Sequence, residues 1–201
     1  MPAFPEDPNV RCMLALKAGR REALDELVQS NAPRLLAFLR HYAGTQEDAE
    51  DIAQLTFASV WEARNNYQPV ARFSTWLYRI AVNHAINHKR REKLRRSGEL
   101  VDGLVCDWRA DAPDHMVRAE AAARVRAAVD ALSPQQRAII LLRCYEGFSM
   151  NELCVALELG LAAVKSLLFR ARQNLKADLE ADIEAVRGLM EPERTRKDLR
   201  A

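Results

Sequence analysis

The chain has 201 residues, of which 49% are hydrophobic and 7 are glycine, and its formal net charge is +2. This composition supports one or two small domains with cores and excludes a disordered chain. No apolar run approaches the ~20 residues of a membrane-spanning helix, and the start MPAFPED lacks the features of a secretion signal. We therefore expect a cytoplasmic protein with no membrane insertion.

Helix-forming residues dominate the whole chain, and β-branched and aromatic residues are scattered, which predicts an all-α fold. Asp7 and Pro8 are suited to begin a short helix that stops at Gly19. In the helix that follows, Pro33 predicts a break or kink. Thr45 is the expected N-cap of a helix over residues 46–64, whose acidic first turn suits the positive end of the helix dipole.

Residues 72–96, RFSTWLYRIAVNHAINHKRREKLRR, predict a helix that begins with aromatic residues and ends in a basic run. Eight Lys and Arg residues against one Glu give this segment a local charge of +7. At 100° per residue, one outward sector of about 120° contains Thr75, Arg79, Asn83, Asn87 and Arg90. Asparagine can recognise a base edge, arginine and lysine bind phosphates, and aromatic rings stack on bases. The pattern favours nucleic-acid binding, although asparagines that are merely solvated remain an alternative.

Residues 97–114 carry one Arg and five acids, a local charge of −4, with glycines, a proline and no helical period. This segment predicts an acidic, flexible linker between two small helical domains, residues 8–96 and 115–180. Residues 181–201 have mixed charge and no period, which predicts a C-terminal tail.

The second domain has the pattern of a helix-turn-helix. Ser133 and Ser149 are expected to begin two helices with capping boxes, and Gly160 marks a tight turn into a third helix. One face of that helix is apolar, with Leu161, Val164, Leu168, Ala171 and Leu175. The opposite face carries Lys165, Ser166, Phe169, Arg170, Gln173 and Lys176. Such a helix is suited to a DNA major groove, but a helical hairpin without DNA has the same geometry.

Two sequence blocks resemble the extracytoplasmic-function sigma factors, the small promoter-recognition subunits of bacterial RNA polymerase. DAEDIAQLTFASVW (48–61) and ARFSTWLYRIAVNHAINHKRR (71–91) are similar to the second region of that family. LSPQQRAIILLRCYEGFSMNELCVALELGLAAVKSLLFRARQNL (132–175) is similar to its fourth region. The resemblance covers about residues 10–92 and 118–178. It implies three partners: core RNA polymerase, through the clamp of its largest subunit and the flap of its second-largest, promoter DNA, and an anti-sigma factor.

The resemblance also implies three sets of site residues. The polymerase-binding residues would be Asp48, Asp51, Gln54, Leu55, Phe57 and Trp61. The residues that melt and recognise the −10 element would be Trp76, Arg79, Asn83, Asn87, Lys89, Arg90 and Arg91. The residues that recognise the −35 element would be Ser149, Ala162, Ala163, Lys165, Ser166, Phe169 and Arg170. The chain departs from the family pattern at Leu55, where an acid is usual, and at Glu158, Ala163 and Leu167, where glycine, threonine and arginine are usual.

Two other functions remain as alternatives. His84 and His88, four residues apart with Cys106 further along, would suit a metal or redox sensor, but no further ligand completes a recognisable set. A helix-turn-helix regulator that works without polymerase would not explain residues 72–96. No phosphate-binding loop, HExxH motif or nucleophile elbow is present, so we expect no catalytic residue, no metal and no cofactor. The four cysteines are widely spaced, which predicts reduced thiols, most of them in the core.

Overall fold

The computed structural model describes residues 4, 6–96 and 115–190, with side chains described over residues 4, 6–92, 94 and 123–180. All regular elements in this part of the chain are helical, as predicted. The first domain contains α1 (Pro8–Lys17), α2 (Ala23–Ala43), α3 (Gln46–Ala63), the 3-10 turn η1 (Arg64–Asn66) and α4 (Phe73–Arg96). The second contains α5 (His115–Ala131), α6 (Pro134–Ile140), the π-helical turn η2 (Leu141–Tyr145), α7 (Met150–Leu157) and α8 (Leu161–Met190). The predicted linker, residues 97–114, lies outside the described residues.

Helix starts follow the capping signals of the sequence. The predicted N-caps accept hydrogen bonds from backbone N–H groups of the first turn at Asp7, Thr45, Ser133 and Ser149. Asp7 also contacts the start of α4, because its Oδ2 accepts a hydrogen bond from the N–H of Phe73 at 3.1 Å. One carboxylate therefore satisfies the starts of α1 and α4 and fixes the two helices to each other.

Of the break or kink predicted at Pro33, the break is wrong, because α2 continues through this residue. The hydroxyl of Ser30 donates to the carbonyl of Glu26 at 2.7 Å, and the amide of Asn31 donates to the carbonyl of Leu27 at 2.8 Å. These side chains bind carbonyls of the turn that proline disturbs. Leu35, Phe38 and Leu39 are fully buried, so tertiary packing maintains the helix beyond the proline.

Helix α8 is also longer than predicted. It continues to Met190, so residues 181–190 are helical, whereas the sequence placed them in the tail. Alanine, glutamate and leucine favour this continuation, and Lys176 pairs with Glu180 one turn apart at 3.6 Å. Residues 191–201 lie outside the described part of the chain.

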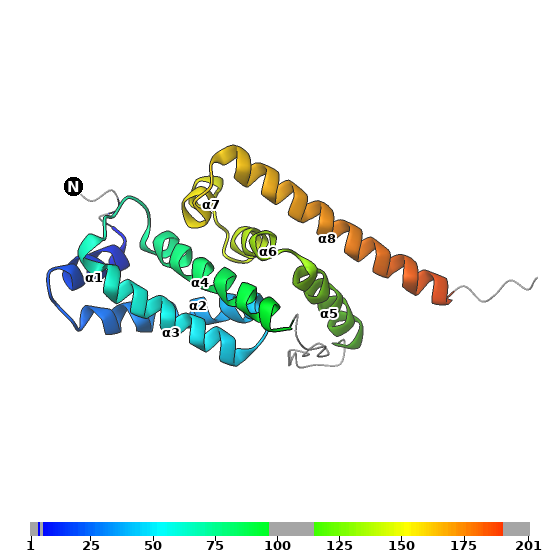
Figure 1. Cartoon of the computed structure of the whole chain (residues 1–201), viewed down its shortest axis with the longest axis horizontal. Coiled ribbons are helices and arrows are strands. Elements are labelled where there is room, and N and C mark those ends of the chain that lie inside the picture. The colour runs from blue at the N-terminus through cyan, green and yellow to red at the C-terminus, as the bar shows by residue number, and fades with distance from the viewer. Residues whose placement is uncertain (1–3, 5, 97–114, 191–201) are drawn as a thin grey trace, which may run out of the picture.

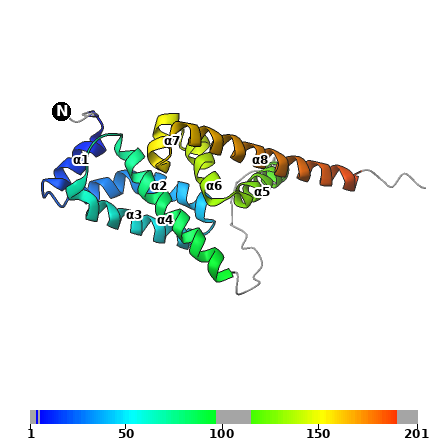
Figure 2. The ribbon, with the colours of Figure 1, turned by 45° about the horizontal axis from the view of Figure 1, so that its top comes forward.

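Each domain has a core, and the two cores meet. In the first domain the largest fully buried side chains include Phe38, Tyr42 and Phe73, and in the second they include Ile139 and Leu142. Figures 1 and 2 show α6 and α7 beside α4, and η2 contacts α2, with α3 on the far side of the first domain. The domains therefore form one continuous buried cluster across their contact.

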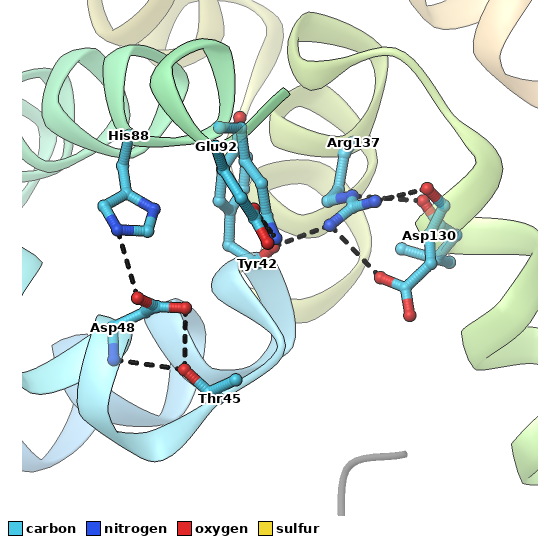
Figure 3. A network of polar contacts seen from close by, with 9 residues as sticks. Tyr42, Thr45, Asp48, His88, Glu92, Asp130 and Arg137 are labelled. Atoms are coloured by element: carbon cyan, nitrogen blue, oxygen red, sulfur yellow. Dashed lines mark hydrogen bonds and ion pairs between the residues drawn. The ribbon is translucent and has the colours of Figure 1, made fainter. Parts of the chain in front are cut away.

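A buried arginine joins the domains where α2 ends (Figure 3). Arg137 is 7% exposed and donates from Nη1 to the carbonyl of Tyr42 at 2.8 Å. The Tyr42 hydroxyl in turn donates to the carbonyl of Pro134 at 3.0 Å. Carbonyls at the end of a helix have no partner within it, so Arg137 acts as a cap from the other domain. None of the described helices is both long enough and apolar enough to cross a membrane.

Candidate nucleic-acid interface

Helix α4 presents most of the polar row that its sequence pattern predicts. Its exposed members are Asn83, Asn87 and Arg90, and Arg91 beside them is also exposed. Lys89 is turned along the helix, where its Nζ pairs with Glu92 Oε2 at 2.8 Å. Arg79 lies at the contact with the second domain, with its Nη1 3.5 Å from Glu158 Oε1. The middle of α4 thus offers two amides to solvent, followed by exposed guanidinium groups.

The first turns of α4 are more enclosed than predicted. Thr75, which the helical phase placed in the outward row, is fully buried at 0% exposure. That placement is wrong because α4 is contacted from two further sides here, by α1 and by α7. Trp76 is half-buried, and its ring centroid lies 4.9 Å from that of Tyr67. The outward row therefore begins at Arg79.

The six α3 residues assigned to polymerase lie in three different environments. Asp51, Gln54 and Leu55 are exposed together, with Leu55 at 51%. Phe57 and Trp61 line a shallow groove against the start of α2, and Arg64 covers the Trp61 ring at 3.8 Å.

Asp48 faces the other way, toward α4 (Figure 3). Its Oδ1 lies 3.1 Å from His88 Nε2, and its Oδ2 accepts from the Thr45 hydroxyl at 2.7 Å. The side chain is therefore already engaged at the α3–α4 contact. The surface that α3 offers to a partner is the acidic and apolar row around Leu55.

The turn between α7 and α8 is built differently from the prediction. Glu158, and not Gly160, adopts the left-handed conformation, with φ of 54° at the C-cap of α7. Its N–H donates to the carbonyl of Cys154, which closes the last turn. A residue with a Cβ is disfavoured in this region. The prediction that Gly160 makes the turn is therefore wrong, because the left-handed residue lies two positions earlier.

The outer face of α8 is open to solvent. Its exposed residues are Ala162, Ala163, Lys165, Ser166, Phe169 and Arg170, with Phe169 at 63%. Ser149, the remaining residue of this set, lies before α7, where its hydroxyl donates to Glu152 Oε2 at 2.7 Å within the capping box. Burial raises the pKa of Glu152, but the hydrogen bonds from Ser149 outweigh it, so the pKa lies below its ordinary value.

The packed face of α8 includes Leu167, one of the residues at which the chain departs from the family pattern. Leu167 is 7% exposed and lies beside Val164 and Leu168 in the core of the second domain. Positions three and four apart share one face of a helix, and α6 covers this face. Leucine here supports packing and leaves Lys165 and Arg170 as the basic groups among the assigned α8 residues.

The histidines of α4 have separate partners. His84 Nε2 lies 2.9 Å from the Ser59 hydroxyl, whereas His88 pairs with Asp48. Among the described residues, no group of three His, Cys, Asp or Glu side chains could hold a metal ion. Cys106 lies outside that part of the chain. Of the other thiols, Cys12 and Cys154 are half-buried and pack against the core, whereas Cys144 is exposed, so the expectation that the cysteines are core residues is wrong for Cys144.

Comparison with known proteins gives the same two regions in the same order. Residues 27–95 match the Sigma-70 region 2 family and residues 122–175 match the Sigma-70 region 4 family. The chain is 35% identical to the ECF RNA polymerase sigma factor SigE of Mycolicibacterium smegmatis over 76% of its own length and 60% of the length of SigE. It is 29% identical to the RNA polymerase sigma factor CnrH of Cupriavidus metallidurans over 90% of this chain and 98% of CnrH. The chain belongs to the extracytoplasmic-function sigma factors.

The fold of this sigma factor also has a solved counterpart. The structure of CnrH in complex with the cytosolic domain of CnrY matches 88% of this chain and 99% of the CnrH chain, with a TM-score of 0.63 and 26% identity. The region 2 match covers α3 and α4 up to residue 95, and the region 4 match covers α6, α7 and the first half of α8.

Sequence reasoning missed the residues that join the two domains of this sigma factor. They are Arg34, Arg137, Glu146 and the pairing partner of Arg79, Glu158. No local pattern identifies such contacts, because each joins residues far apart in the chain. The one available signal was the departure at Glu158, a charged residue where the family usually has glycine.

Proposed function

We propose that this sigma factor binds core RNA polymerase and directs it to promoters, where α4 melts and recognises the −10 element and α8 recognises the −35 element. The observation that supports this most directly is the exposed pair Asn83 and Asn87 on α4, followed by Arg90 and Arg91. A stand-alone duplex-binding regulator would have no use for amides beside a basic run on a second helix. Such a binding role requires no catalytic residue and places the protein in the cytoplasm with the polymerase.

The row around Leu55 is the surface of α3 that we assign to the polymerase clamp. Asp51 and Gln54 flank an apolar side chain that is 51% exposed, which suits a partner that buries apolar area inside a polar rim. Phe57 and Trp61 lie in the neighbouring groove. They would widen this contact only if the partner reached toward α2.

The decisive experiment is reconstitution with core RNA polymerase and a library of promoter fragments. We expect transcription that starts at defined sites and depends on the added sigma factor. Tight, sequence-specific duplex binding by the free protein, with no transcription from several core enzymes, would support a stand-alone regulator instead.

We also propose that an anti-sigma factor covers exposed apolar residues of both domains. CnrH was solved with the cytosolic domain of a second protein, CnrY. In the present chain Leu55 and Phe169 are 51% and 63% exposed on separate domains, and apolar side chains at such exposure are suited to a partner. Purification from the native host tests this: recovery with polymerase alone under all growth conditions would argue against an anti-sigma factor.

A further inference from the structure

Helix α3 contacts both histidines of α4, and each histidine directly follows one of the asparagines proposed to recognise bases. We propose that Asp48 is a positioning residue for recognition of the −10 element and not a polymerase contact: it acts through His88 to fix the direction of Asn87. This inference rests on the function proposed above, because it requires that the amides of α4 bind DNA.

Two polar contacts join α4 to α3, and we call them the histidine clasp. His84 Nε2 lies 2.9 Å from the hydroxyl of Ser59, and His88 Nε2 lies 3.1 Å from Asp48 Oδ1. The two histidines are about one turn apart on α4, whereas their partners are about three turns apart on α3. A single contact would leave α4 free to turn about it. Two separated contacts fix both the rotation of α4 and its position along α3.

Both carboxylate oxygens of Asp48 have partners within the first domain (Figure 3). The Oδ1 atom lies beside His88, and the Oδ2 atom accepts a hydrogen bond from the Thr45 hydroxyl at 2.7 Å. Thr45 is the N-cap of α3, and its hydroxyl also accepts from the N–H of Asp48. The side chain of Asp48 is only 26% exposed. A polymerase surface would therefore have to displace a partner that is already bound.

The rest of the α4 face that carries the histidines has small side chains. Ala81 and Ala85 are both 0% exposed. Because positions three and four apart share a helix face, these alanines lie on the same side of α4 as the two histidines. A methyl group permits close packing but interlocks little with a facing helix. At this face, the rotation of α4 about its axis therefore depends more on the clasp than on apolar contacts.

The rotation of α4 determines where its amides point. Neighbouring positions on a helix differ by 100°, so each asparagine is directed to solvent when the histidine after it faces α3. Both Asn83 and Asn87 are exposed. For an amide about 5 Å from the helix axis, a rotation of ~20° gives a displacement of ~2 Å. A hydrogen bond to a base edge would not survive a displacement of this size.

Two other acids of α3 lie outside the clasp. Asp51 is exposed in the row around Leu55 that we assign to polymerase, and Glu47, also exposed, directly precedes Asp48 in the first turn. Single changes at these three acids can therefore separate polymerase docking from the positioning of α4.

The test measures promoter melting and core polymerase binding in parallel. Asp48→Ala and His88→Ala should each lower the ratio of melted to closed promoter in the polymerase complex by about threefold to fivefold, the size expected for one partly exposed pair, and leave polymerase affinity within about twofold of wild type. Alanine favours helix, so α4 itself is retained. His88→Gln keeps an N–H donor for Asp48 and should stay near the wild-type ratio.

A second comparison asks whether Asp48 acts through Asn87. In an Asn87→Ala background, the further change Asp48→Ala should lower the melting ratio by less than about twofold, because the amide that it orients is already absent. A general role in domain stability would give the same loss in both backgrounds. Glu47→Ala is the matched control and should leave melting and polymerase binding unchanged. Asp51→Ala should weaken polymerase binding.

Two results would overturn the positioning role. In the first, Asp48→Ala weakens polymerase binding as much as Asp51→Ala does, and the melting ratio of the bound promoter is unchanged. In the second, the loss from Asp48→Ala is the same whether or not Asn87 is present.

Hydrogen exchange of the free protein tests the clasp without polymerase or DNA. The amides of residues 84–91 should exchange about threefold to fivefold faster in Asp48→Ala and His88→Ala than in Glu47→Ala. Faster exchange in these variants, together with no promoter-dependent transcription by the wild-type protein, would retain the contact of Asp48 with α4 and reject the sigma-factor function. Equal exchange rates in the three variants would overturn the positioning role whatever the transcription result.

Discussion

The two helices assigned to DNA differ in how much of their surface is exposed to solvent. The outer face of α8 is exposed from Ala162 to Arg170. On α4, by contrast, the start is enclosed, with Leu77 and Tyr78 only 1% and 3% exposed, and Arg79 is engaged by Glu158. The α8 face proposed for the −35 element is therefore open to solvent, whereas the α4 face proposed for the −10 element includes a residue, Arg79, that already pairs with Glu158.

The largest effect is expected from the amides of α4. Asn83→Ala should reduce promoter melting and relax the preference at one base of the −10 element, because a side chain that pairs with a base edge contributes about 1–3 kcal/mol of discrimination. Polymerase binding should be unchanged, since we assign that contact to α3. Melting is measured by permanganate reactivity and base preference by selection from a randomised −10 element.

Asn65→Ala is the control for this prediction, because Asn65 is an exposed asparagine in η1, outside α4. It should leave melting and base preference unchanged. If Asn83→Ala behaved in the same way as Asn65→Ala, or if it unfolded the protein, the asparagine would be solvated or structural.

A smaller effect is expected from a phosphate contact on α8. Arg170→Gln should weaken binding to duplexes with any −35 sequence and lower the slope of log affinity against log salt by about 0.9, the value for one phosphate. Because the α8 face is already exposed, the loss should be the same for the free protein and for the polymerase complex. Fluorescence anisotropy at several salt concentrations measures it, with Arg11→Gln on α1 as the control.

The sequence predicts the helices better than it predicts what packs on them. Caps at Asp7, Thr45, Ser133 and Ser149 are local, since each hydrogen bond joins residues within one turn. The outward position of Asn83 and Asn87 also follows from helical phase alone. Thr75 has the same phase but is buried, because α1 and α7 cover that end of α4.

The domain contact could not be predicted from local patterns at all. Arg34 and Glu146 are separated by 112 positions in the chain, and no local pattern connects them. Glu158 alone was a hint of this contact, because it is a charged residue at a position where the family usually has glycine. Its pairing with Arg79 appears only when the two domains are placed together.

A smaller effect, on the free energy of unfolding, is expected from the turn between α7 and α8. Glu158→Gly should raise the free energy of unfolding by about 0.5 kcal/mol, since relief of a left-handed residue outweighs one exposed ion pair. The thermal midpoint would rise by a few degrees. Gly160→Ala is the companion variant: no positive φ is recorded there and a Cβ would meet no atom within 4 Å, so it should be tolerated. A loss of stability in Glu158→Gly would show that the ion pair outweighs the strain.

The smallest expected effect is a pH dependence at the domain contact. Burial, with a further contribution from the charge of Arg126, lowers the pKa of His41 below its ordinary value of 6.5. The folded chain therefore favours the neutral ring, which makes a T-shaped contact with Tyr145, and the unfolded chain binds the proton more readily. The contribution of neutral His41 to the stability of the folded chain is complete above pH 6.5 and is lost as the pH falls below that value. Urea unfolding at pH 7.5 and pH 5.5 should show a decrease that is smaller in His41→Gln. An equal decrease in both proteins would assign it to other groups, including His84, whose pKa is lowered in the same direction by burial.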